Sequence, residues 1–292
     1  MIDDILAKFD GAFAENTIRA YRSDFIQYQT WCSQNKLKPI PASADTMAVY
    51  VDHLSNINKS ATIRRRINSL GTILKLSKNH DPTKDPEVVL ALKRMHRKIG
   101  SAQEQPAPLT KPLLDQLLGN CDNSIRGIRN QVLLRLGYET MRRRSELCAF
   151  KFEDIANAPN GKPIINLNFS KTDQYGAGKV LSISEDLTIL LHLWREILGS
   201  EGYILRSINR HGHIGDNLNP ASVSTILKGL QNKLNTASTQ PSLSGHSFSG
   251  HSFRVGAALD LLEQGEPIER IMLRGGWKTD ATAMKYLRNC NF

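Results

Sequence analysis

A polar segment at residues 100–108, GSAQEQPAP, divides this sequence into two parts of different character. The segment contains two prolines and no periodic apolar residues, a composition that is typical of a linker. The residues before it repeat apolar side chains at helical spacing, whereas those after it mix helical patterns with strand-like runs. We therefore predict one domain over residues 1–100, a linker over 101–109 and a second domain over 110–292.

The first domain is predicted to be entirely helical, because apolar residues recur at helical spacing in segments that begin near residues 18, 44, 60 and 86. The third and fourth segments also carry basic side chains, namely Arg64, Arg65, Arg66, Lys93, Arg94, Arg97 and Lys98. Basic helix faces are often merely solvated. Here two helices have many basic side chains, and the whole chain has a formal net charge of +10. This combination favours a surface that binds along a DNA backbone.

The side chains best suited to chemistry lie near the C-terminus. His251 and Arg254 are three residues apart, so a helix that begins near Gly250 would place both on one face. A cation beside a hydrogen-bonding ring at a helix N-terminus suits an anion such as phosphate. Downstream, Trp277 can donate an N–H, and the phenol of Tyr286 can act as a nucleophile.

The motif around His251 is immediately preceded by a copy of itself. Residues 244–248 read SGHSF, and residues 249–253 repeat those letters. Only the second copy is followed by an arginine, Arg254, and by a helical apolar pattern. We therefore assign the functional histidine to His251 and expect His246 to be loop material.

Two other motifs precede this region. Residues 140–147 read TMRRRSEL, and chemistry alone does not decide which of the three consecutive arginines would act on a ligand. Residues 164–169 and 180–184 are predicted strands, and the segment between them is a predicted hairpin loop that carries Lys171 and Lys179.

As a set, these motifs resemble the tyrosine recombinases, the phage integrase family, and most of all its Cre recombinase branch. That family shows His-x-x-Arg, then Gly-Gly-(His/Trp), then a nucleophilic Tyr nine residues later, and the matching residues here are His251, Arg254, Trp277 and Tyr286. The resemblance covers nearly the whole chain, although the N-terminal part matches only in pattern.

The resemblance also implies roles in the two other motifs. The family's first arginine box reads roughly Thr-Gly-Leu-Arg-x-Ser-Glu-Leu, so alignment on Ser-Glu-Leu implies that Arg143 is catalytic and that Glu146 orients its guanidinium. The family carries a catalytic lysine on a β-hairpin in a Lys-Thr context, which implies Lys171, with Lys179 as a second choice.

The fold implied is mainly α with a small β-sheet: a helical core-binding domain plus an α+β catalytic domain that clamp DNA. The function implied is site-specific recombination through a 3′-phosphotyrosine and a Holliday junction, without metal or ATP. No Walker loop, G-x-G-x-x-G or acidic metal cluster is present, and His211 and His213 lack companion ligands at metal spacing. We therefore expect no cofactor. The alternatives are a type IB topoisomerase or telomere resolvase with the same active site, and a non-catalytic DNA-binding protein.

The expected partners are double-stranded DNA with an inverted-repeat site and further copies of this chain, as a tetramer on two sites. Six residues follow Tyr286. Cre-like members continue into a further helix that docks onto a neighbouring subunit, and six residues are too few for it. The resemblance therefore leaves the packing of subunits open. The acidic first residues and the lack of a long apolar run predict no membrane association and a location in the bacterial cytoplasm, at the nucleoid.

Overall fold

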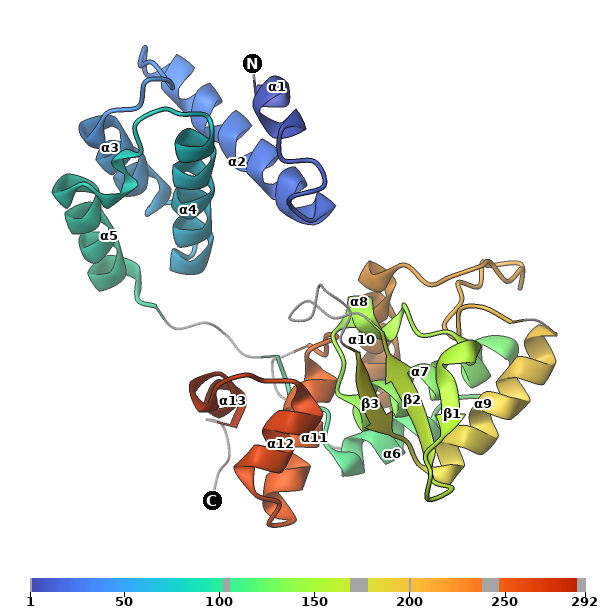
Figure 1. The fold of residues 1–292 in the computed structure, drawn as a ribbon. Coiled ribbons are helices and arrows are strands. Elements are labelled where there is room, and N and C mark those ends of the chain that lie inside the picture. Colours follow the sequence, from blue (N-terminus) through green and yellow to red (C-terminus); the bar gives the residue numbers. More distant parts are fainter. Residues whose placement is uncertain (1, 102–105, 169–177, 200, 238–246, 288–292) are drawn as a thin grey trace. The chain divides into compact units, whose positions relative to one another are not determined.

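A computed structural model describes residues 2–101, 106–168, 178–199, 201–237 and 247–287 (Figure 1). The chain divides into two compact units, residues 1–104 and 105–292. Within the described ranges, no helix has the length and apolar character that crossing a membrane requires. The predicted fold class, mainly α with a small β-sheet, is confirmed by the elements of the two units.

The first unit is built from helices alone in its described part. They are α1 (Ile2–Ala7), α2 (Glu15–Gln34), α3 (Ala44–Leu54), α4 (Ser60–Leu76), the 3₁₀ helix η1 (Pro82–Lys84) and α5 (Pro86–Ile99). Helix α2 packs against α4, and α3 packs against α5. The prediction missed α1 and placed the start of α2 three residues late. Helix α1 is a single short element whose stability comes from packing on α2, and local periodicity does not report such packing.

An aromatic cluster lies in the core of this unit. The Tyr28 ring centroid is 5.0 Å from that of Tyr50, and Trp31 lies 4.9 Å from the same ring. Tyr28 and Trp31 come from α2 and Tyr50 from α3, so these rings join the two helices. Aromatic pairs at these distances stabilise a core beyond the area that they bury.

The second unit contains a small sheet covered by helices. Its elements are α6 (Lys111–Gly119), α7 (Ile125–Thr140), α8 (Arg144–Leu147), η2 (Phe152–Asp154), β1 (Ile155–Asn157), β2 (Pro163–Leu167), β3 (Lys179–Ser182), α9 (Glu185–Leu198), α10 (Pro220–Ala237), α11 (Ser252–Glu263), α12 (Ile268–Gly275) and α13 (Asp280–Leu287).

The described sheet is antiparallel in the order β1-β2-β3. Ile165 of β2 pairs with Ile155 of β1 and with Leu181 of β3, and both Ile165 and Leu181 are buried. The two predicted strands correspond to β2 and β3. The prediction missed β1, because three residues are too few to show the two-residue alternation that identifies a strand.

Helix α7 is the central helix of this unit, and α6, α9 and α11 all pack against it. Its residues Val132, Leu133, Leu134 and Leu136 are all fully buried. Helix α11 approaches α7 closely at Gly137, where an added Cβ would lie 2.7 Å from the ring of Phe253. Since no larger residue fits there without displacing Phe253, Gly137 allows the two helices to pack at this distance.

A buried carboxylate fixes the position of α11. Asp260 accepts a hydrogen bond from the backbone N–H of Lys111 at 2.7 Å and another from the Tyr138 hydroxyl. Thr110 lies at the N-cap of α6, but its side chain forms no capping bond, and the Asp260 carboxylate accepts the N–H of Lys111, the first residue of α6, instead. Asp260 therefore ties α11 to the start of α6 and to α7.

Candidate active site

The arginine motif forms the first side of the candidate site. Arg143 lies at the N-cap of α8, and its Nη1 is 2.8 Å from Oε1 of Glu146. The other carboxylate oxygen of Glu146 accepts the backbone N–H of Arg143 at 3.2 Å. The Glu146 side chain is 5% exposed and that of Arg143 is 23% exposed. The carboxylate thus holds a guanidinium that remains accessible to a ligand.

A second guanidinium, that of Arg254, comes from the first turn of α11 and is 1% exposed. Its Nη1 donates to the carbonyl oxygen of Met141 at 2.8 Å. Met141 ends α7 in the left-handed region, with φ of 53°, a conformation that favours glycine. The family pattern has Gly at this position, so Met141 departs from the pattern where the backbone conformation favours glycine.

Trp277 and Tyr286 complete a layer of rings over Arg254. The Arg254 guanidinium lies 4.9 Å from the Trp277 ring and 6.0 Å from the Tyr286 ring. The two rings are 5.1 Å apart and inclined at 37°. Trp277 follows α12, and Tyr286 lies on α13. Residues from three segments of the sequence therefore meet at one point, as the resemblance to the family implies.

The indole N–H of Trp277 is buried, and among the described residues it has no hydrogen-bond partner. A buried donor without an acceptor costs about 1–3 kcal/mol. Such a group is expected where a ligand supplies the acceptor. The indole lies beside Arg254 and Tyr286, where an anionic oxygen of a ligand would accept a hydrogen bond from its N–H.

The site has an excess of positive charge. The pKa of Arg254 is lowered to about 10, first by burial and then by the charges of Arg143 and Arg142. Burial also lowers the pKa of Arg142 to about 10; the carboxylate of Glu146 opposes this shift. The guanidiniums of Arg254 and Arg142 both remain charged at neutral pH, and Glu146 is the one carboxylate among the causes of their pKa shifts. A bound anion would stabilise this arrangement.

Lys171, the predicted catalytic lysine, lies outside the described residues. Lys179, the second choice, begins β3, and its Nζ donates to the carbonyl oxygen of Leu273 in α12. Burial lowers the pKa of Lys179, and the charges of Arg142 and Arg254 lower it further. Lys179 is therefore close to the arginines, but its ammonium already binds a backbone carbonyl.

His251 lies at the N-cap of α11 and is exposed, whereas Arg254 one turn later is buried. The backbone N–H of His251 donates to the hydroxyl oxygen of Ser249 at 3.3 Å. The helix begins at Ser252, two residues later than the sequence predicts. His246, the alternative histidine, lies outside the described residues.

The predicted DNA-binding residues of α4 differ in their surroundings. Arg64 and Arg65 line a groove of about 420 Å³ together with Tyr21, Ala61, Asn68, Ser69 and Thr72. Arg65 also forms an ion pair with Asp24. Arg66 turns inward, with Nη1 at 3.0 Å from Oδ1 of Asn58 and Nε at 3.8 Å from Asp24. Helical spacing from Arg64 and Arg65 would have indicated Asn68 and Thr72, which the sequence interpretation did not name.

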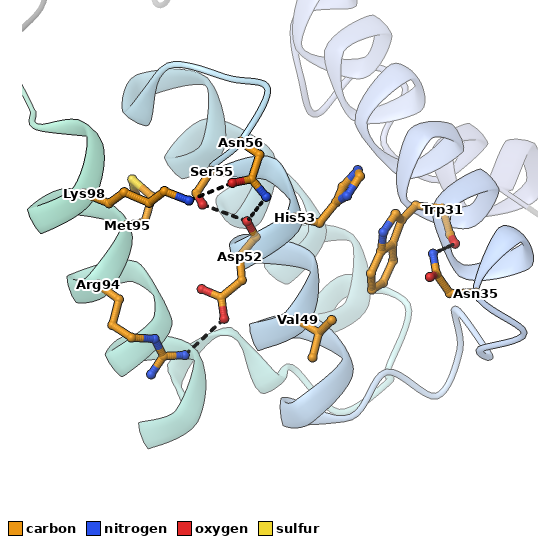
Figure 2. A pocket seen from close by; sticks show the side chains of 10 residues that line it. All are labelled: Trp31, Asn35, Val49, Asp52, His53, Ser55, Asn56, Arg94, Met95 and Lys98. Atoms are coloured by element: carbon orange, nitrogen blue, oxygen red, sulfur yellow. Dashed lines mark hydrogen bonds and ion pairs between the residues drawn. The ribbon is translucent and has the colours of Figure 1, made fainter.

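The predicted cations of α5 lie elsewhere in the unit. Arg94 and Lys98 line a pocket of about 510 Å³ to which α2, α3 and α5 all contribute (Figure 2). Arg94 is 3.3 Å from the carboxylate of Asp52, and Lys98 donates to Asn56 at 2.7 Å. Lys93 and Arg97 are exposed on the same helix. The predicted basic residues therefore form separate clusters on α4 and α5.

No group of His, Cys, Asp and Glu that could hold a metal ion occurs in the described part of the chain. His211 and His213 are exposed in the loop before α10, and His211 accepts from Arg210 at 2.9 Å.

The sequence profile of the Phage integrase family matches residues 107–291, which is more than half of the chain. The chain belongs to this family, and the predicted membership is confirmed.

Individual relatives cover most of the chain. The protein named "Integrase/recombinase xerD homolog" from Selenomonas ruminantium is 29% identical over 95% of this chain and 83% of its own length. "Recombinase cre" from Escherichia phage P1 is 26% identical over 95% of this chain and 85% of its own length. A solved structure of a lambda integrase tetramer bound to a Holliday junction has a TM-score of 0.67 and 15% identity, and the match covers 99% of this chain and 77% of that one. This likeness supports the fold.

Proposed function

We propose that this protein is a site-specific DNA recombinase that cleaves and rejoins DNA strands through a 3′-phosphotyrosine. The observation that carries the proposal is the layer formed by Tyr286, Trp277 and Arg254, in which an indole N–H without a partner among the described residues lies beside a phenol and a buried guanidinium. A phosphodiester placed there would meet a nucleophile and several donors at once. Membership of the Phage integrase family supports this reading.

In the cleavage step, the Tyr286 oxygen attacks phosphorus while the bond from phosphorus to the 5′-oxygen breaks. The phenolic proton leaves the nucleophile, and the departing 5′-oxygen gains a proton, so the number of protons is unchanged. The product is a 3′-phosphotyrosine and a free 5′-hydroxyl. The ester retains the free energy of the phosphodiester, so rejoining to a hydroxyl needs no ATP.

Arg143 and Arg254 would hold the two non-bridging oxygens, on which negative charge develops. Planar guanidiniums suit phosphate because their donors are arranged as a fork. Glu146 holds Arg143 at 2.8 Å, and Met141 anchors Arg254 at 2.8 Å, so the donors are positioned before the substrate binds. Such preorganised donors account for much of enzymatic rate enhancement. The indole of Trp277 would add a further N–H.

The acid and the base are assigned by resemblance to the family. Lys171 would protonate the 5′-oxygen, and His251 would accept the phenolic proton and return it during rejoining. The exposure of His251 beside the buried Arg254 is compatible with this role. A metal ion is not required in this scheme, because cationic side chains supply the positive charge.

We propose that strand exchange joins two duplexes, each with an inverted-repeat site, through a Holliday junction held by a tetramer of this chain. The lambda integrase structure of the same fold is a tetramer bound to such a junction. Residues 1–100 would bind the duplex with the α4 cations, residues 110–292 would perform the chemistry, and the two domains would clamp the DNA. The protein would act in the bacterial cytoplasm, at the nucleoid.

Covalent capture tests this proposal. Tyr286→Phe protein, which lacks only the phenolic oxygen, would select its site from a randomised duplex library. The selected site would then be synthesised with a nick near its centre and incubated with the parent protein. We expect a covalent band on denaturing gels, with the nucleotide on Tyr286 by mass spectrometry.

The matched control is Tyr203→Phe in the same unit, which should cleave like the parent. Tyr286→Phe should bind the site and form no adduct. An adduct that persists in Tyr286→Phe, or that maps to another residue, would contradict the proposal.

A further inference from the structure

Arg142 is a buried guanidinium that none of the assigned roles uses. It occupies the position at which the family pattern has Leu, and it is 2% exposed. A charge that is buried to this extent must be bound by several acceptors to be tolerated. Its acceptors therefore indicate what the residue does.

The Arg142 side chain joins the C-terminal ends of two helices. Its Nε donates to the carbonyl oxygen of Thr140 in α7 at 2.7 Å, and its Nη2 donates to the carbonyl oxygen of Arg274 in α12. The Arg274 guanidinium reaches back to the carbonyl oxygen of Glu139 in α7, with Nε and Nη2 both at 3.3 Å. The last carbonyls of a helix lack partners within the helix, and cations stabilise them.

A third cation binds the same turn of α12. Lys179 of β3 donates to the carbonyl oxygen of Leu273, next to the carbonyl that Arg142 binds. The end of α12 is thus held from the arginine motif on one side and from the sheet on the other.

The turn held in this way leads directly into Trp277. Gly276 ends α12 with φ of 69°, and a Cβ added to it would lie 2.9 Å from Nη1 of Arg142. The backbone N–H of Trp277 then donates to the carbonyl oxygen of Met272 at 3.0 Å. Arg142 therefore binds the carbonyl of Arg274 and lies close to Gly276, which are three residues and one residue before Trp277.

We propose that Arg142 is a positioning residue for strand cleavage, which fixes the end of α12 so that the Trp277 N–H points at the scissile phosphate. This inference rests on the proposed function, in which Trp277 is a phosphate donor. A shift of about 1 Å in a group that contacts the reacting atoms can cost about a hundredfold in rate. Loss of the bridge would therefore be seen in the chemical step more than in DNA binding.

A double-mutant cycle distinguishes positioning from a general effect of charge or folding. Arg142→Leu, which installs the residue of the family pattern, should lower the cleavage rate at saturating protein by roughly 10- to 100-fold. The protein concentration that half-saturates the nicked site should change less than about twofold, since the phosphate contacts that dominate DNA affinity are kept. In a Trp277→Phe background, the same substitution should cost less than about threefold, because the donor that it positions is absent.

Arg144→Leu is the matched control, because Arg144 is the exposed neighbour in the same triplet, and it should stay within about twofold of the parent. If Arg142→Leu does not fold, Arg142→Lys replaces it in the cycle, since it keeps the charge and most of the volume but not the planar fork.

Equal fold-losses in the parent and Trp277→Phe backgrounds would overturn the positioning role, as would an Arg142 variant that cleaves like the parent. If Trp277→Phe itself cleaves like the parent, both this inference and the role of Trp277 fail. A covalent adduct that does not depend on Tyr286 would instead contradict the proposed function.

Discussion

Substitution of Met141 tests the link between backbone conformation and the catalytic arginine. Met141 is fully buried and packs with Val255, Ile271 and Trp277, while its carbonyl oxygen anchors Arg254. Met141→Ala removes this packing but keeps a Cβ in the left-handed region. Met141→Gly removes the same packing and also relieves the backbone strain.

Loss of packing lowers the free energy of unfolding, and relief of backbone strain raises it. Their magnitudes therefore decide whether Met141→Gly is less stable than the parent. Truncation of a buried methionine to alanine costs about 2–5 kcal/mol, whereas a left-handed residue with a Cβ costs about 1 kcal/mol relative to glycine. Packing therefore outweighs strain. We expect Met141→Ala to lose about 3 kcal/mol and Met141→Gly about 2 kcal/mol of unfolding free energy.

Hydrogen exchange of the α7 and α11 amides would measure these losses within the second unit alone. We also expect slower cleavage in both variants, with the alanine variant more affected. A glycine variant as stable as the parent would refute the packing role. An alanine variant more stable than the glycine variant would refute the left-handed conformation at residue 141.

Three further outcomes follow from the proposed roles. Lys171→Ala should block cleavage of ordinary DNA far more than cleavage of a substrate with a 5′-sulfur leaving group, because sulfur departs without an acid. Equal losses of rate on both substrates would show that Lys171 is not the acid. Arg143→Ala should raise the cleavage barrier by about 3 kcal/mol, roughly a hundredfold in rate, and Arg144→Ala much less; the reverse order in single-turnover rates would show that the register through the triplet is wrong. His251→Ala should strongly lower the cleavage rate at saturating protein, while His246→Ala stays within a few-fold of the parent. A lower cleavage rate in His246→Ala than in His251→Ala would assign the functional histidine to the first copy of the repeat.

The elements with clear periodicity were predictable from sequence, and short elements were not. Helices α4 and α5 and strands β2 and β3 follow from their apolar patterns, whereas α1 and β1 are too short to show one. The resemblance to the family implied that Arg254, Trp277 and Tyr286 act together, and the fold does bring them together.

The features that sequence reasoning missed depend on partners far along the chain. Arg142 is buried because Arg274 supplies a carbonyl acceptor, and no local pattern encodes that contact. The capping of α6 by Asp260 rather than Thr110 has the same cause, since its donor and acceptor are separated by 149 positions. Met141 could have been noticed, because the family pattern has glycine where its left-handed backbone occurs.

Strand exchange between two duplexes tests the central claim most directly. Two duplexes of different length, each with the site selected by the Tyr286→Phe protein, would be incubated together with the parent protein. We expect recombinant duplexes of new length, with Holliday junctions as intermediates, only when both duplexes contain the site. Covalent adducts without recombinants, together with relaxation of a supercoiled plasmid that carries the site, would indicate a topoisomerase-like enzyme, and binding without any adduct would indicate a non-catalytic DNA-binding protein; either result would contradict the proposed recombinase.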